Sequence, residues 1–254
     1  STVELLISKG ADVLTSGGDG FQPLHVAALN GHTSTLGLLL DRGAAIDVKD
    51  ARGHTALMIS VERGDDGMFE MLLGRKASLA VVSNEGASVL HLAAGRGNVR
   101  QVRRLLDGGM DASAAPEPSR LTPLHFAAGS GNPDTVKVLL AAGAKLNAVT
   151  KDLETPLMFA ARSRRYEDDQ EDSRLDNVDL LIAKGADVNA QDKQGESVLD
   201  IATNAHHGED ARSEQDHQEM LALLEKHGAK PGVPKKEKPQ PKIESPEPSD
   251  PFGK

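Results

Sequence analysis

The segment LTPLHFAAGSGN at residues 121–132 occurs earlier in the chain, in altered form, as FQPLHVAALNGH at residues 21–32. Both segments hold a Pro-Leu-His step that is followed, one residue later, by two alanines. Self-similarity at a period of about 20 to 50 residues is typical of a stack of small structural units. Related segments align with spacings of 33, 33, 34, 33 and 42 residues on Leu24, Leu57, Leu90, Leu124, Leu157 and Leu199.

Each unit is expected to contain two short helices. In the unit that starts at Leu121, Thr122 can cap the first helix and Pro123 can occupy its first position, where a missing N–H is harmless. Asn132 can cap the second helix, and Gly143 can end it in the left-handed conformation that glycine adopts freely. Helices of about two to three turns are not stable alone, so neighbouring units must cover their apolar faces.

The period of 33 residues, the TPLHFAA segment at residues 122–128 and the LLIAKGADVNAQD segment at residues 180–192 resemble the ankyrin repeat family. The resemblance implies an all-α solenoid of stacked helix-turn-helix units with β-hairpin loops. It implies six repeats over residues 21–230, preceded at residues 1–20 by the C-terminal half of a truncated repeat. The implied function is a non-catalytic scaffold that binds a protein partner on its concave face.

Several segments depart from the repeat pattern. Residues 1–15 match only the second helix of a unit, so we expect the chain to be excised from a longer protein. Insertions are expected near residues 164–174 and 206–216. Residues 231–254 contain seven prolines and little apolar periodicity, which predicts a disordered tail. Repeat two has Ala56, Met58 and Lys76 where the pattern has Pro, His and Gly.

The composition excludes several classes of function. The chain has 29 Lys and Arg against 38 Asp and Glu, and this net charge of -9 argues against binding to nucleic acid. It has no cysteine, so disulfides and thiolate metal sites are excluded. No apolar run approaches the roughly 20 residues that span a bilayer, so we expect no membrane insertion. The expected protein is intracellular, cytoplasmic and monomeric.

The histidines do not predict a metal site. His25, His91 and His125 recur once per repeat, and stacked helices about 8 to 10 Å apart are too distant for one metal to bridge them. The resemblance implies that these histidines join adjacent loops by hydrogen bonds. His206, His207 and His217 lie among acidic residues without a His-x-x-x-His pair, which favours a solvated loop.

No catalytic residue and no cofactor are expected. The sequence has no phosphate-binding glycine loop followed by Lys-Ser or Lys-Thr, and no nucleophile elbow. Two modifications stay open. Asn147 and Asn189 occupy the position that asparaginyl hydroxylases modify in some ankyrin proteins, and Ser245-Pro246 could be a phosphorylation site.

The partner-binding residues are expected at the loop tips and in the last turn of each first helix, on one concave face. Arg52, Arg63 and Arg96 would then lie on neighbouring units, which predicts a partner with an acidic segment. The alternative is that these arginines pair with Glu62 and Glu85 in the chain itself. A second alternative is a regulatory or substrate-docking segment of a larger enzyme or channel. The predicted contact residues are Phe21, Arg52, His54, Glu85, Leu121, Asp152 and Glu154 at the loop tips, with Glu62, Arg63, Arg96 and Arg162 at the helix ends.

Overall fold

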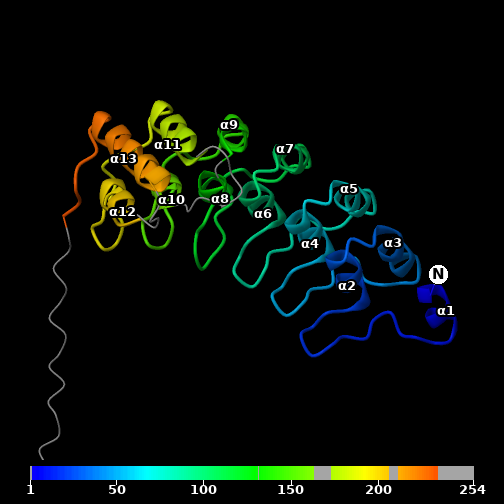
Figure 1. The fold of residues 1–254 in the computed structure, drawn as a ribbon. Coiled ribbons are helices and arrows are strands. Elements are labelled where there is room, and N and C mark those ends of the chain that lie inside the picture. The colour runs from blue at the N-terminus through cyan, green and yellow to red at the C-terminus, as the bar shows by residue number, and fades with distance from the viewer. Residues whose placement is uncertain (1, 131, 163–172, 206–210, 234–254) are drawn as a thin grey trace, which may run out of the picture.

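The computed structural model describes residues 2–130, 132–162, 173–205 and 211–233. In these residues the chain forms helices in two rows that run side by side along a curved stack (Figure 1). The first row consists of α2 (Pro23–Leu29), α4 (Ala56–Arg63), α6 (Val89–Gly95), α8 (Pro123–Gly129), α10 (Pro156–Arg162) and α12 (Val198–Asn204). The second row consists of α3 (Thr33–Asp41), α5 (Asp66–Gly74), α7 (Val99–Asp107), α9 (Pro133–Ala141), α11 (Ser173–Ala183) and α13 (Ala211–Lys226).

Each first-row helix and the second-row helix that follows it are called a unit, from unit one (α2 and α3) to unit six (α12 and α13). A further helix, α1 (Thr2–Ser8), precedes unit one. The loops that lead into the first row all extend to the inner side of the curve (Figure 1). The all-α solenoid predicted from the sequence is therefore confirmed.

The helix ends follow from local sequence. Thr122 is the N-cap of α8, and the side-chain oxygen of Asn132 accepts hydrogen bonds from the first-turn N–H groups of α9. Gly143 has φ +90° just beyond α9, in the left-handed region. These three residues therefore occupy the capping positions expected from the sequence, because each satisfies backbone groups that a helix end leaves without partners.

The core lies between the two rows and continues from unit to unit. The six aligned leucines of the sequence pattern are all buried in it. The alanine pairs of the repeated segment are buried as well, and their short side chains let neighbouring first-row helices approach closely. The pairs are Ala27 and Ala28, Ala93 and Ala94, Ala127 and Ala128, and Ala160 and Ala161.

The loops form tight hairpin turns that are joined at their tips. Within a loop, Asp50 N–H donates to the carbonyl of His54 at 2.9 Å, and Thr150 N–H donates to that of Glu154 at 3.0 Å. Between loops, a row of backbone hydrogen bonds links successive tips, and we call this row the tip ladder. It consists of Ala51 N–H to Asp19 O, Asn84 N–H to Arg52 O, Lys151 N–H to Ser119 O and Lys193 N–H to Asp152 O.

The second insertion differs from the expected solvated loop. Helix α13 has 16 residues, whereas α9 has nine, so the part of the insertion from Ala211 onwards lengthens a second-row helix. Glu214 is exposed, whereas Met220 and Leu224 are buried, so α13 is a partly exposed helix. The rest of that insertion, residues 206–210, lies outside the described residues. So do residues 163–172 of the first insertion and the predicted tail beyond residue 233.

Lys76 adopts the left-handed conformation that the repeat register requires, with φ +64°. The equivalent residues Gly43 and Gly109 have φ values of +92° and +89°. We predict that Lys76→Gly raises the free energy of unfolding by about 1 kcal/mol, because the Cβ of Lys76 is strained in this conformation. Urea unfolding monitored by circular dichroism measures the change.

The control is the reverse substitution at the same position of unit three. A Cβ built on Gly109 meets nothing within 4 Å, so Gly109→Lys changes the backbone strain alone and is expected to lower stability by a similar amount. A lower unfolding midpoint for Lys76→Gly would contradict the assigned register.

Candidate partner-binding face

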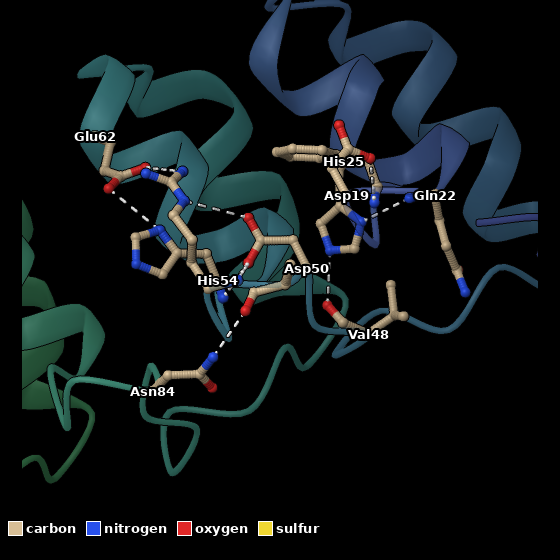
Figure 2. Close-up of polar contacts among 11 residues, drawn as sticks. Asp19, Gln22, His25, Val48, Asp50, His54, Glu62 and Asn84 are labelled. Carbon is tan, nitrogen blue, oxygen red and sulfur yellow. Dashed lines mark hydrogen bonds and ion pairs between the residues drawn. The ribbon is translucent and has the colours of Figure 1, made fainter. Parts of the chain in front are cut away.

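Three histidines join first-row helices to the loops, as the sequence resemblance implies. His91 Nε2 lies 3.1 Å from the carbonyl oxygen of Leu121, and its Nδ1 accepts a hydrogen bond from Ser88 N–H. His125 makes the same contacts with Glu154 O and Thr122 N–H. In unit one, His25 Nε2 lies 2.9 Å from Val48 O (Figure 2). Both ring nitrogens are engaged, so these buried side chains are structural and not available as ligands.

Unit six reverses this contact. Asp200 stands at the histidine position, and its Oδ2 accepts hydrogen bonds from Ser197 N–H at 2.8 Å and from Gly232 N–H at 2.6 Å. A Cβ built on Gly232 would lie 2.0 Å from the carbonyl oxygen of Gly195, so only glycine fits there. Burial raises the pKa of Asp200, but the N–H donors lower it by more, so the carboxylate stays ionised.

A polar cluster in unit two joins the loop before α4 to the end of that helix (Figure 2). His54 Nδ1 lies 3.2 Å from Glu62 Oε1, and Arg52 lies 4.0 Å from Glu62 and 3.7 Å from Asp50. The hydrogen bond from His54 lowers the pKa of Glu62 and outweighs its partial burial. The structure therefore brings together three residues predicted as contacts, Arg52, His54 and Glu62, from one loop and the end of α4.

The same two positions contact each other in units two, five and six, and in any unit we call them the inner-face pair. The pair consists of the residue two positions before a first-row helix and the residue eight positions later, at the end of that helix. In unit five, Glu154 forms an ion pair with Arg162, and in unit six Asn204 donates to Glu196 at 3.4 Å. Sequence reasoning missed Glu196 and Asn204, although they have the same spacing of eight residues as His54 and Glu62.

Units three and four break this polar series. Their inner-face pairs are Ala87 with Gly95, and Leu121 with Gly129. The ring of Phe126 lies over Gly95, because a Cβ built there would be 3.1 Å from Phe126 Cδ1. A Cβ built on Gly129 meets nothing within 4 Å. The middle of the inner face, at units three and four, is therefore apolar and has no side chain at the helix ends. The polar pairs of units two and five lie on either side of it.

The remaining predicted contact residues form no part of the polar inner-face pairs. Arg63 donates to the carbonyl of Leu29, whereas exposed Arg96 has no carboxylate partner among the described residues. Glu85 is exposed and forms no ion pair with an arginine among the described residues. Of the expected ion pairs between these arginines and Glu62 or Glu85, the described residues show the one between Arg52 and Glu62. Asp152 pairs with Lys193 at 3.0 Å. Phe21 packs edge-on against His25, 5.8 Å between ring centres.

The structure adds limits to other functions. Among the described residues, no group of three or more His, Asp or Glu could hold a metal ion, although His206 and His207 lie outside that part of the chain. No helix in the described part is long and apolar enough to cross a membrane. The side chains of Asn147 and Asn189 bond to backbone groups of the next loop, including Asp187 N–H and Lys230 N–H.

The fold and the inner-face pairs define a solenoid of stacked helix pairs, and comparison with known proteins gives the family. The model for ankyrin repeats in three copies matches residues 1–82, 62–150 and 90–192. These matches cover more than half of the chain, so it belongs to the ankyrin repeat family. The crystal structure of the human ASB11 ankyrin repeat domain is similar, with a TM-score of 0.68 and 26% sequence identity over 90% of this chain and 93% of that chain. No curated relative matches.

Burial makes the histidine contacts sensitive to acid. It lowers the pKa of His125 from 6.5 to about 4, although the bond to Glu154 O opposes the shift, and it lowers the pKa of His91 in the same way. Between pH 6.5 and 4 the unfolded chain binds a proton at His125 that the folded chain does not, so the free energy of unfolding falls as the pH falls. We predict a loss of up to about 3 kcal/mol from His125 over this range.

The prediction is tested by urea unfolding of His125→Met at several pH values. Methionine occupies the equivalent position as Met58 and Met158, so the fold accommodates it. The variant is expected to be less stable than the parent chain at pH 7 and to lose less stability on acidification. His32→Gln is the control for removal of an exposed histidine. An unchanged pH dependence in His125→Met would show that His125 takes up its proton in the folded state as well.

Proposed function

We propose that this chain is a non-catalytic scaffold that binds an extended segment of a partner protein along the inner face of units two to five. Ankyrin repeats generally serve as protein-protein interaction modules, and the family match supports this class of function. At the helix ends of the inner side, Arg63, Arg96 and Arg162 are exposed, whereas the repeated leucines, alanines and histidines are buried in the core and in the contacts between loops. The proposal includes no chemistry carried out by the scaffold.

The observation that carries the proposal is the pair of arginines Arg63 and Arg96. Arg63 is the last residue of α4, and Arg96 directly follows the last residue of α6. The two positions are equivalent in the repeat, and both side chains are exposed. Within the described residues neither forms an ion pair with a carboxylate, whereas Arg52, Arg100 and Arg104 each do. Arginine is the charged side chain most enriched at interface hot spots, and its planar group binds carboxylates with two parallel hydrogen bonds. An acidic residue of the partner would complete this part of the face.

We predict that Arg63→Glu combined with Arg96→Glu weakens partner binding about thirtyfold, or about 2 kcal/mol. The reversed charges would repel the acidic segment. The probe is a set of peptides selected on the full chain from a display library of random short peptides, with affinity measured by fluorescence anisotropy. The melting midpoint of the double variant is expected to stay close to that of the parent chain.

The matched control reverses two exposed arginines of the second row, with Arg42→Glu combined with Arg103→Glu. It makes the same change in net charge away from the inner face and is expected to leave affinity unchanged. Equal losses in both double variants would indicate a general charge effect. Full binding by Arg63→Glu with Arg96→Glu, and loss on deletion of residues 164–174 or 231–254, would move recognition to those segments.

A further inference from the structure

We number each loop by the unit into which it leads, and within the described residues the tip ladder has one gap. At the other four junctions a backbone N–H of one loop donates to a carbonyl of the preceding loop tip. The equivalent donor position in the loop of unit four is Pro118, which has no N–H. The carbonyl of Glu85, which stands at the acceptor position in unit three, therefore receives no ladder bond. Loops three and four are the one neighbouring pair, in this part of the chain, whose tips are not tied together.

A small pocket lies at this gap. It is lined by Glu85, Gly86 and Ala87 of loop three, His91 of α6, Ser119 and Leu121 of loop four, and Phe126 of α8. Beside the gap the loops remain close together, because a Cβ built on Gly86 would lie 3.1 Å from the carbonyl oxygen of Glu117. The pocket therefore has apolar walls at Ala87, Leu121 and Phe126, and one of its lining residues is Glu85, whose carbonyl receives no ladder bond.

The pocket exists because the side chains at the inner-face positions of unit three are small. At the loop position of Ala87, units two, five and six carry His54, Glu154 and Glu196, each of which contacts the residue at the end of its helix. Alanine makes no such contact, and its partner position is Gly95. A side chain from another molecule can therefore approach Phe126 and Leu121 where, in units two and five, it would meet charged groups.

Charge at the rim favours an acidic neighbour for that side chain. Exposed Arg96 follows Gly95, whose backbone lies against the ring of Phe126, so Arg96 is next in sequence to a residue that contacts the wall of the pocket. Exposed Arg120 follows Ser119 on the other wall and lies 3.9 Å from Glu117. Glu85 is the single acidic residue that lines the pocket. A carboxylate beside an apolar side chain would be matched by the two arginines.

We propose that the pocket between loops three and four receives an aliphatic side chain from an extended partner segment, with an adjacent carboxylate bound by Arg96. A backbone N–H of the segment donates to the carbonyl of Glu85 and so takes the place of the ladder bond that Pro118 cannot make. The small pocket suits the end of a valine, leucine or isoleucine side chain better than a large aromatic ring. This inference rests on the proposed function and names the chemistry of its partner.

The test uses peptides selected on the full chain from the random display library. The selected peptides are expected to carry Val, Leu or Ile next to Asp or Glu. Ala87→Leu is expected to weaken their binding about tenfold, because the added side chain fills the pocket. The loop accommodates leucine at this position, since Leu121 occupies it in unit four. Glu196→Leu places the same side chain at the same position of unit six and is expected to leave affinity unchanged.

A double-mutant cycle separates direct contact from a general loss of structure. Replacing the aliphatic residue of the peptide by alanine should weaken binding to the parent chain but have little further effect on Ala87→Leu, because the two changes remove one contact. Additive losses, unchanged affinity for Ala87→Leu, or selected peptides without the aliphatic-acidic pair would overturn the pocket proposal. If binding were still lost in Arg63→Glu with Arg96→Glu, the inner-face function would stand and the pocket alone would be wrong.

Discussion

Burial of each short helix against the next unit is the constraint on which the rest of this structure depends. The first-row helices have seven or eight residues, and helices of this length are marginal in water. Their leucines and alanine pairs reach the core only when a neighbouring unit covers them. Stability therefore depends on contacts between neighbouring units, and residues outside those contacts can differ from unit to unit. The inner face shows such differences, with His54, Ala87 and Leu121 at one equivalent position.

Polar joints determine how the units are aligned, because apolar packing alone is not directional. Each histidine of the repeated segment caps its own helix through Nδ1 and reaches the loops of the next unit through Nε2. The tip ladder adds a backbone bond at the far end of the loop. With a histidine at the base and a ladder bond at the tip, a loop is held at two points. Loop four is joined at its tip to loop five through the carbonyl of Ser119, but it has no ladder bond to loop three, so the spacing of loops three and four at their tips depends on packing such as that of Gly86 against Glu117.

The sequence predicts those features that depend on a residue and its immediate neighbours. The caps at Thr122 and Asn132, the left-handed Lys76 and the burial of the aligned leucines follow from spacing and from known backbone preferences. Arg120 and Leu153 show where this reasoning ends. Both have positive φ values, at loop positions where Gly53 and Gly86 stand in other units. Their strain is tolerated because the hairpins and the ladder fix the loops, and these contacts join residues that are distant in the sequence.

The candidate site was predicted as a set of positions, and of its internal contacts only a pairing of arginines with Glu62 and Glu85 was expected, as an alternative to partner binding. The sequence placed Arg52, His54 and Glu62 on one face, but the pairing of a loop residue with a helix end depends on how far each loop reaches over its helix. Units two and five carry charged inner-face pairs, whereas units three and four carry an apolar residue and a glycine, and this contrast is visible only once the pairing is known. The gap in the ladder at Pro118 is likewise a matter of register between loops, since a proline in a turn is otherwise unremarkable.

Asp200 reverses the direction of the hydrogen bond between a first-row helix and the segment that follows its unit. The histidines of earlier units present an N–H to a carbonyl of the following loop, whereas Asp200 presents a carboxylate that accepts the N–H of Gly232. A further unit of the same kind would bring a carbonyl oxygen to this carboxylate, and two acceptors repel each other. The chain instead crosses the end of unit six at a glycine that fits against the backbone of Gly195. The change from imidazole to carboxylate thus exchanges a donor for an acceptor at this position, and the segment that follows unit six supplies the matching donor at Gly232.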